Sequence, residues 1–139
     1  MKLLIDTNIV LDILLKREPF YQTSAEVLEL THINEVQEYV TASAITDIYY
    51  IAYRQIRDKE KVRKLLQDLL QIISVATVSA QEINLAIKLA WKDFEDSVQY
   101  SVASIQAMDG LVTRNPQDYK AAKLKIWQPE QLIQHFTER

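Results

Sequence analysis

Met1–Asn8 reads MKLLIDTN, and this stretch decides how the chain folds. Residues 1–5 are a short apolar run, typical of a strand buried in a parallel sheet. The run breaks at Asp6, and Asn8 can cap a helix over the apolar residues 9–15. Open α/β sheets bind ligands beyond the carboxyl ends of their strands. We therefore predict that Asp6 lies at a ligand-binding edge, an interpretation that competes with a plain helix cap.

Beyond this stretch, runs of strand length alternate with segments of helical periodicity. Further strands are expected at 38–42, 74–78, 106–112 and 125–127, and helices at 22–33, 44–57, 59–73, 98–103 and from Ser79 and Pro129. This order predicts an α/β fold, with a parallel central sheet covered on both faces and right-handed crossovers. The chain has 139 residues and 48% hydrophobic content, so we expect residues 1–139 to form a single domain.

The composition excludes several kinds of site. There is no cysteine and only one glycine, which excludes disulfides, thiolate metal sites and glycine-rich phosphate loops. A metal would have to be bound by oxygen or by His32 and His135, which lack ligand spacing and are expected at or near the surface. No apolar run approaches the ~18 residues of a membrane span. We therefore expect a cytoplasmic protein with no membrane partner.

Charge is unevenly distributed along the chain. The formal net charge of -3 argues against indiscriminate binding of nucleic acid. Residues 54–73 nevertheless form a basic strip, in which three acidic residues oppose six basic ones: Arg54, Arg57, Lys59, Lys61, Arg63 and Lys64. The strip can be a solvated helix with its preceding loop or an edge that contacts phosphates. Similarly, Tyr49, Tyr50, Tyr53 and Ile56 can pack in the core or form an apolar contact face.

Carboxylates recur at or near the ends of expected elements. Asp47 follows a strand end near the start of a helix, where it could merely complement the helix dipole. Asp96 precedes a helix of small residues, and Asp93, three residues earlier, can bind metal or only cap. The strand ends after residues 5, 42 and 112 can converge on one rim of a parallel sheet. Together with Asp6, these side chains point to one acidic pocket.

Such a pocket needs a proton or a cation. Two carboxylates ~4 Å apart repel by roughly 4 kcal/mol at an effective dielectric constant of 20. Oxygen ligands without thiolate favour Mg²⁺ or Mn²⁺, which often keep waters that can attack phosphorus. Asn115 offers an amide oxygen at the end of the strand 106–112, and Asp118 is a less favoured substitute one turn later. Asp12 is expected to face solvent or a partner.

Four ordered segments resemble the PIN-domain family, specifically the VapC-type toxins of toxin-antitoxin pairs. The segments are LLIDTNIVLD at 3–12, TASAITDIYYIAYR at 41–54, DFEDSVQYSVA at 93–103 and LVTRNPQDY at 111–119. The resemblance covers nearly the full chain. It implies a three-layer α/β/α PIN-like domain and an endoribonuclease that depends on Mg²⁺ or Mn²⁺.

The resemblance also implies roles for individual residues. Asp6 and Asp96 would hold the ion, and Asp47, where the family usually has glutamate, would orient or deprotonate the attacking water. Asn115 stands where many members have aspartate. Because the Asn115 amide binds a divalent ion more weakly than a carboxylate, and Asp47 is shorter than glutamate, one tightly bound metal is favoured over two. Asp93 is a possible further ligand. The polar residues implied to position the substrate are Thr7, Asn8, Thr113 and Arg114.

The resemblance implies an RNA substrate cut internally by metal-activated water, a small antitoxin protein and a homodimer. One alternative is a catalytically inactive PIN-like interaction module, because a fold can persist when activity is lost. Another is a phosphotransfer hydrolase with Asp6 as nucleophile. The haloacid-dehalogenase pattern of such enzymes requires an acidic residue at position 8, where this chain has Asn8.

Overall fold

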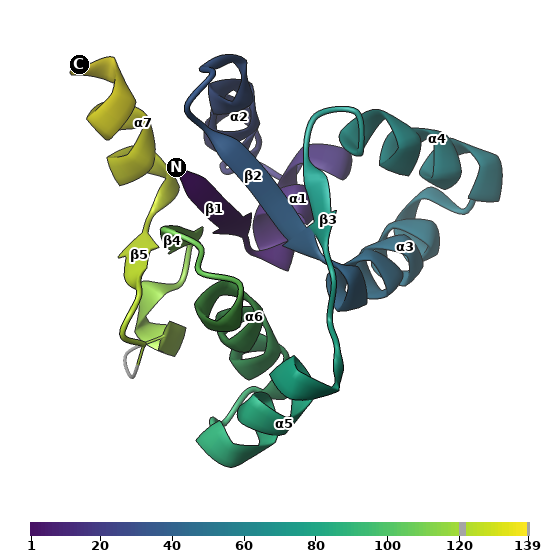
Figure 1. Ribbon diagram of the computed structural model, residues 1–139. Coiled ribbons are helices and arrows are strands. Elements are labelled where there is room, and N and C mark those ends of the chain that lie inside the picture. Colours follow the sequence, from purple (N-terminus) through teal and green to yellow (C-terminus); the bar gives the residue numbers. More distant parts are fainter. Residues whose placement is uncertain (120–121, 139) are drawn as a thin grey trace.

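The central sheet of the computed structural model contains five parallel strands in the order β3-β2-β1-β4-β5 (Figure 1). The structure describes residues 1–119 and 122–138. Within these residues the strands are β1 (Lys2–Ile5), β2 (Gln37–Thr41), β3 (Ser74–Ala76), β4 (Gly110–Val112) and β5 (Lys125–Trp127). The α-helices are α1 (Thr7–Leu14), α2 (Tyr21–Glu29), α3 (Ala42–Ile56), α4 (Lys59–Leu69), α5 (Ala80–Leu89), α6 (Phe94–Ile105) and α7 (Pro129–Thr137). Two 3₁₀ helices are η1 (Leu30–His32) and η2 (Pro116–Tyr119).

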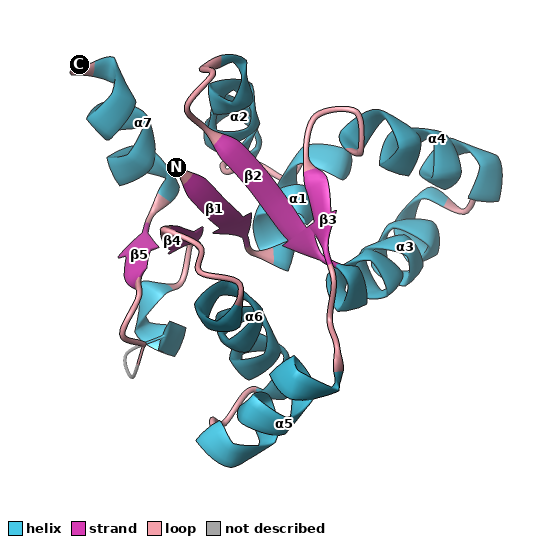
Figure 2. Cartoon of the chain, viewed as in Figure 1, coloured by secondary structure: helices cyan, strands magenta, loops and turns pink. Residues whose placement is uncertain are grey.

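Alternating residues of β1 supply the cores on the two faces of the sheet. Leu3 and Ile5 pack into the core built with α1, α2, α3 and α7, whereas Leu4 packs into the core built with α5, α6 and η2. Figure 2 shows the helices on both sides of the strands. The three-layer α/β/α fold with a parallel sheet is therefore confirmed.

The order in which strands are added to the sheet reverses at β1. Strands β2 and β3 lie on one side of it and β4 and β5 on the other, and the Asp6 amide donates to the Val112 carbonyl at 2.9 Å. The carboxyl ends of β1 and β4 thus open side by side. In sheets of this kind, ligands bind at such a switch point.

Helix starts differ from expectation at two informative places. Asp6, and not Asn8, occupies the position before α1, but its side chain makes no capping hydrogen bond. The side chain of Thr41, and not Ser43, caps α3 by accepting from the Ala44 amide at 3.1 Å. Because α3 begins at Ala42 and has no acid in its first turn, Asp47 lies in the second turn. The interpretation of Asp47 as a dipole partner is therefore wrong.

The strand expected over 106–112 is too long. Helix α6 continues to Ile105, and Ala107 adopts a φ of 55° after it, so strand geometry begins only at Gly110. Other bounds differ by up to about one helical turn. The Ser79–Glu82 capping box and the start of α7 at Pro129 are confirmed. Among the described residues, no helix combines the length and apolar character needed to cross a bilayer.

Glu38 is a carboxyl group buried in the sheet. It lies opposite Leu3 on β1, and its side chain is 2% exposed. Neither of its oxygens has a hydrogen-bond partner among the described residues. Burial raises the pKa of Glu38 to about 8. The folded protein therefore holds a proton at Glu38 that the unfolded chain, with an ordinary pKa near 4.5, releases.

We expect Glu38→Met to stabilise the protein at high pH. Proton release on unfolding makes stability fall as pH rises from about 4.5 to 8, so removing the carboxyl should add up to roughly 4 kcal/mol at pH 7.5. The gain should be much smaller at pH 4, where both states mostly hold the proton. Urea unfolding at the two pH values measures the difference, with Glu26→Met on the exposed surface of α2 as the control. An equal gain at both pH values would contradict a proton held at Glu38.

Candidate active site

Asp6 is held at the switch point by side chains from two other elements. Thr113, directly after β4, donates its hydroxyl to Asp6 Oδ2 at 2.7 Å, and Gln99 of α6 donates from Nε2 to Oδ1 at 3.1 Å. Asp6 is 5% exposed. Burial raises its pKa, and the hydrogen bonds from Thr113 and Gln99 offset part of that rise. The carboxyl group of Asp6 is therefore fixed in position and favours a bound proton or cation.

Asp96, in the first turn of α6, lies close enough to Asp6 to feel its charge. The Tyr119 hydroxyl donates to Asp96 Oδ1 at 3.2 Å. Burial, followed by the negative charges of Asp93 and Asp6, raises the pKa of Asp96 to about 7. The two carboxylates expected to hold an ion are thus brought to one place, although they are ninety residues apart in sequence.

Glu95 belongs to the same acidic region, and the sequence interpretation missed it. The Thr7 hydroxyl donates to Glu95 Oε1 at 2.7 Å. Half burial of Glu95, then the charges of Asp47, Asp6 and Asp93, raise its pKa. Asp47 itself is exposed on α3 and makes this contribution through its charge. The signal available in the sequence was the position of Glu95 between Asp93 and Asp96.

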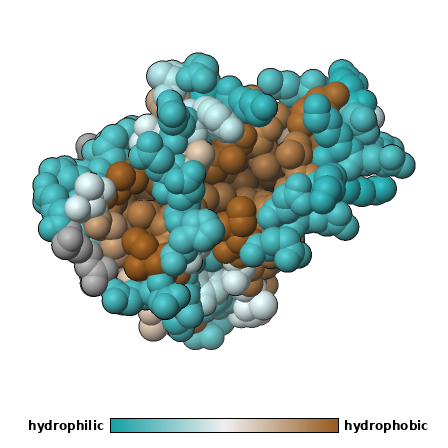
Figure 3. All heavy atoms as spheres, turned by 90° about the horizontal axis from the view of Figure 1, so that it is seen from above, coloured by the Kyte–Doolittle hydropathy of each residue, from teal (hydrophilic) through white to brown (hydrophobic). Residues whose placement is uncertain are grey.

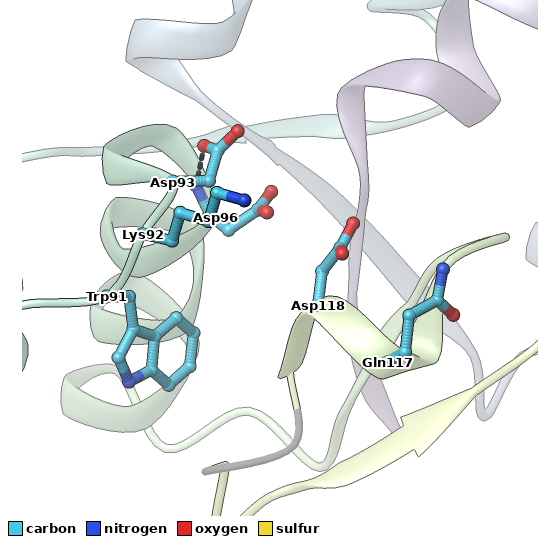
Figure 4. Close-up of a pocket in the computed structure, with 6 residues that line it drawn as sticks. All are labelled: Trp91, Lys92, Asp93, Asp96, Gln117 and Asp118. Atoms are coloured by element: carbon cyan, nitrogen blue, oxygen red, sulfur yellow. Dashed lines mark hydrogen bonds between the residues drawn. The ribbon is translucent and has the colours of Figure 1, made fainter.

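A cleft of about 480 Å³ opens beside Asp96 and is lined by Trp91, Lys92, Asp93, Asp96, Gln117 and Asp118 (Figure 4). The residues of α6 and the segment before it form one wall, and the η2 residues form the other. The charge of Asp118 contributes to the raised pKa of Asp96. Asp118 lines this cleft together with Asp96, and Asn115 is not among its lining residues.

Asp93 caps α6. It is exposed, and its Oδ1 accepts from the Asp96 amide at 3.0 Å. The cap interpretation of Asp93 is therefore confirmed. Its charge still reaches the acidic region, because it raises the pKa of both Asp96 and Glu95.

Asp12 is buried and paired, so its expected position facing solvent or a partner is wrong. The side chain is 0% exposed and accepts from Arg114 Nε at 2.8 Å and from a second guanidinium nitrogen at 3.2 Å. Ser24 of α2 donates to it at 3.1 Å. The guanidinium also lies 3.8 Å from the ring centre of Phe20. These contacts fix Arg114, which stands between Thr113 and Asn115 on the loop after β4.

The remaining polar residues near the site have distinct positions. Asn8 is half-buried in α1, and the Asn115 amide donates to Thr113 Oγ1 at 3.1 Å. Thr113 therefore connects Asn115 to Asp6. His32 and His135 are exposed, as expected.

Helices α3 and α4 present the basic strip and the tyrosines. All six basic side chains between 54 and 64 are exposed. Tyr49 stacks on Tyr53 with ring centres 6.3 Å apart, and Tyr50 is 56% exposed. Core packing is therefore wrong for Tyr50, whose side chain is available for contact.

The donors present suit a hard divalent cation. They are carboxylate oxygens, which Mg²⁺ and Mn²⁺ prefer. In the part of the chain that the structure describes, no three acidic or histidine side chains gather closely enough to surround an ion by themselves. The fit is thus to an ion held by one or two carboxylates and completed by water or substrate oxygens, which is the usual binding mode of Mg²⁺.

Comparison with known proteins places this geometry in a family. A model of the PIN domain matches residues 2–117. The fold is similar to the DNA-bound VapBC of Salmonella typhimurium, with TM-score 0.72, 16% identity and coverage of 93% of this chain and 98% of the other. The fold is also similar to VapBC2 of Rickettsia felis bound to a promoter DNA fragment, with TM-score 0.71, 18% identity and coverage of 92% of this chain and 98% of the other. VapC20 of Mycobacterium tuberculosis, a Sarcin-Ricin loop cleaving toxin, is similar with TM-score 0.63, 12% identity and coverage of 78% of this chain and 86% of the other. No curated protein matched in sequence. The match over residues 2–117 shows that the chain belongs to the PIN-domain family.

Proposed function

We propose that this protein is a metal-dependent endoribonuclease and the toxin of a VapBC-type toxin-antitoxin pair. The observation that carries the proposal is the hydrogen-bonded link from Asp6 through Gln99 and Tyr119 to Asp96, which lines an open cleft. Membership of the PIN-domain family supports nuclease chemistry. The fold shared with a toxin described as cleaving the Sarcin-Ricin loop supports RNA as the substrate.

In this proposal the acidic residues have two roles, metal binding and orientation of the attacking water. Asp6 and Asp96 would hold one Mg²⁺ or Mn²⁺, which would supply positive charge for the phosphodiester and a water acidic enough to attack phosphorus. Glu95 and Asp47, whose charges interact beside Asp6, would orient the attacking water or accept its proton.

Neighbouring polar residues position the carboxylates and the RNA. Thr113 fixes Asp6 and Thr7 fixes Glu95 through 2.7 Å hydrogen bonds. Asn115 and Asn8 present amides for substrate oxygens. Arg114 acts through the loop that it holds, because Asp12 already engages its guanidinium. The exposed basic strip of α3 and α4 contacts phosphates away from the cut.

We also propose an antitoxin partner and a homodimer. Several solved structures with this fold are VapBC or toxin-antitoxin complexes. One face of the molecule gathers apolar residues between polar borders (Figure 3). Exposed apolar patches of this kind mark protein contact sites. The exposed Tyr50 of α3 offers a further contact.

The direct test is cleavage of mixed single-stranded RNA by the purified protein. We expect internal cuts with Mn²⁺ or Mg²⁺ and none with EDTA, measured on gels and by mass spectrometry of the new ends. Cleavage that persists in EDTA would contradict the metal role. Absence of cleavage together with absence of Mn²⁺ binding would favour the inactive interaction module.

A further inference from the structure

Gln99 connects the two central carboxylates. It lies in the middle of α6 and is 1% exposed. Its Nε2 donates at 3.1 Å to Asp6 Oδ1 and at 3.1 Å to the Tyr119 hydroxyl. The Tyr119 hydroxyl in turn donates at 3.2 Å to Asp96 Oδ1. An unbroken series of hydrogen bonds, here called the Gln99–Tyr119 bridge, therefore runs from Asp6 to Asp96.

The bridge has one direction. The amide nitrogen of Gln99 has two hydrogens, and both are used. The Tyr119 hydroxyl accepts one of them and donates its only hydrogen to Asp96. If the Gln99 amide turned over, its oxygen would face the Asp6 carboxylate and both donations would be lost. The two carboxylates thus determine how the amide and the hydroxyl are oriented.

The same orientation leaves Gln99 Oε1 buried without a hydrogen-bond partner among the described residues. A buried polar atom without a partner lowers stability, so an apolar side chain would suit α6 better if packing were its only role. The amide is retained where its nitrogen serves Asp6 and Tyr119. This cost points to a role at the carboxylates.

We infer that Gln99 and Tyr119 are positioning residues, which set the separation of Asp6 and Asp96 for a divalent cation. The inference rests on the proposed function. The bridge uses one oxygen of each carboxylate and leaves the other oxygen to different partners, so it orients the carboxylates without by itself exhausting their capacity to bind. Hydrogen bonds to metal-binding carboxylates typically change metal affinity 10–100-fold when removed.

The first test replaces Tyr119 with phenylalanine, which removes only the hydroxyl. We expect Mn²⁺ affinity, measured by calorimetry, to fall roughly tenfold or more. Tyr100→Phe is the matched control. Tyr100 lies on α6 next to Gln99, packs against Trp91 with ring centres 5.0 Å apart and accepts from the Lys123 amide at 3.3 Å. Its hydroxyl makes no hydrogen bond to Asp6 or Asp96 among the described residues. This variant should bind Mn²⁺ like the wild type.

The second test replaces Gln99 with methionine, alone and together with Tyr119→Phe. Because both residues belong to one bridge, we expect the double variant to bind Mn²⁺ about as weakly as the weaker single variant. Thermal unfolding without metal provides a readout of packing, and only small shifts are expected there. A merely structural role would lower the unfolding temperature and leave Mn²⁺ affinity unchanged.

The outcomes separate the bridge from the proposed function. Wild-type binding of Mn²⁺ that Asp6→Asn abolishes, with unchanged affinity in Tyr119→Phe and Gln99→Met, would overturn the bridge alone. An equal loss of affinity in Tyr100→Phe would also overturn it. A wild-type protein that neither binds Mn²⁺ nor cuts RNA would overturn the proposed function, and the bridge with it.

Discussion

Replacing Asp6 with asparagine is expected to lower metal-dependent RNA cleavage by at least about 100-fold. The change removes one of the two carboxylates proposed to hold the ion, and with it several kcal/mol of charge stabilisation. The fold should persist, because the Thr113 hydroxyl that now donates to Oδ2 can turn and accept from the new amide. Initial cleavage rates in Mn²⁺ and circular dichroism measure the two effects.

Glu26→Gln is the control for this experiment. It removes the same charge from an exposed residue of α2, outside the acidic region and the basic strip. Its cleavage rate should equal that of the wild type. Undiminished cleavage by purified Asp6→Asn would reject the assignment of Asp6.

Asp12→Ala is expected to reduce the free energy of unfolding by roughly 3 kcal/mol or more. The variant leaves the Arg114 guanidinium without its buried acceptor, and Ser24 also loses a partner. A small domain has only about 5–15 kcal/mol of stability, so the loss is a large share. Urea unfolding measures it.

Two variants test the physical cause. Asp68→Ala breaks the exposed Lys64–Asp68 pair and should cost at most about 1 kcal/mol. Asp12→Leu combined with Arg114→Met replaces the buried carboxylate and its partly buried partner with apolar groups, and should recover much of the loss. If the double variant were as unstable as the sum of the single variants, an uncompensated charge would not be the cause.

The sequence predicted what depends on strand order and local pattern. The apolar run before Asp6 and the alternation of strands and helices sufficed for the parallel sheet, because such patterns have few packing solutions. The meeting of Asp6 with the loop at Thr113 followed from the same reasoning, since parallel strands end at one edge.

The features that could not be predicted from the sequence depend on contacts between side chains that are far apart along the chain. Asp12 reads as a surface residue until α1 is packed between the sheet and α2, where Arg114, from a position 102 residues away, supplies its partner. Gln99 reads as one polar residue in a helix of small ones. Its contacts with Asp6 and Tyr119 span 93 and 20 residues, distances over which periodicity carries no information.

The central place of β1 has a consequence for synthesis on the ribosome. Asp6 emerges first, but its hydrogen-bond partners Gln99 and Thr113 are translated much later, and the Thr113 contact spans 107 residues. A nascent chain that ends before β4 therefore lacks Thr113 and Tyr119, whose hydroxyls hold Asp6 and Asp96 in place. The proposed nuclease would therefore lack these two supports of its acidic pocket until β4 and η2 have been made.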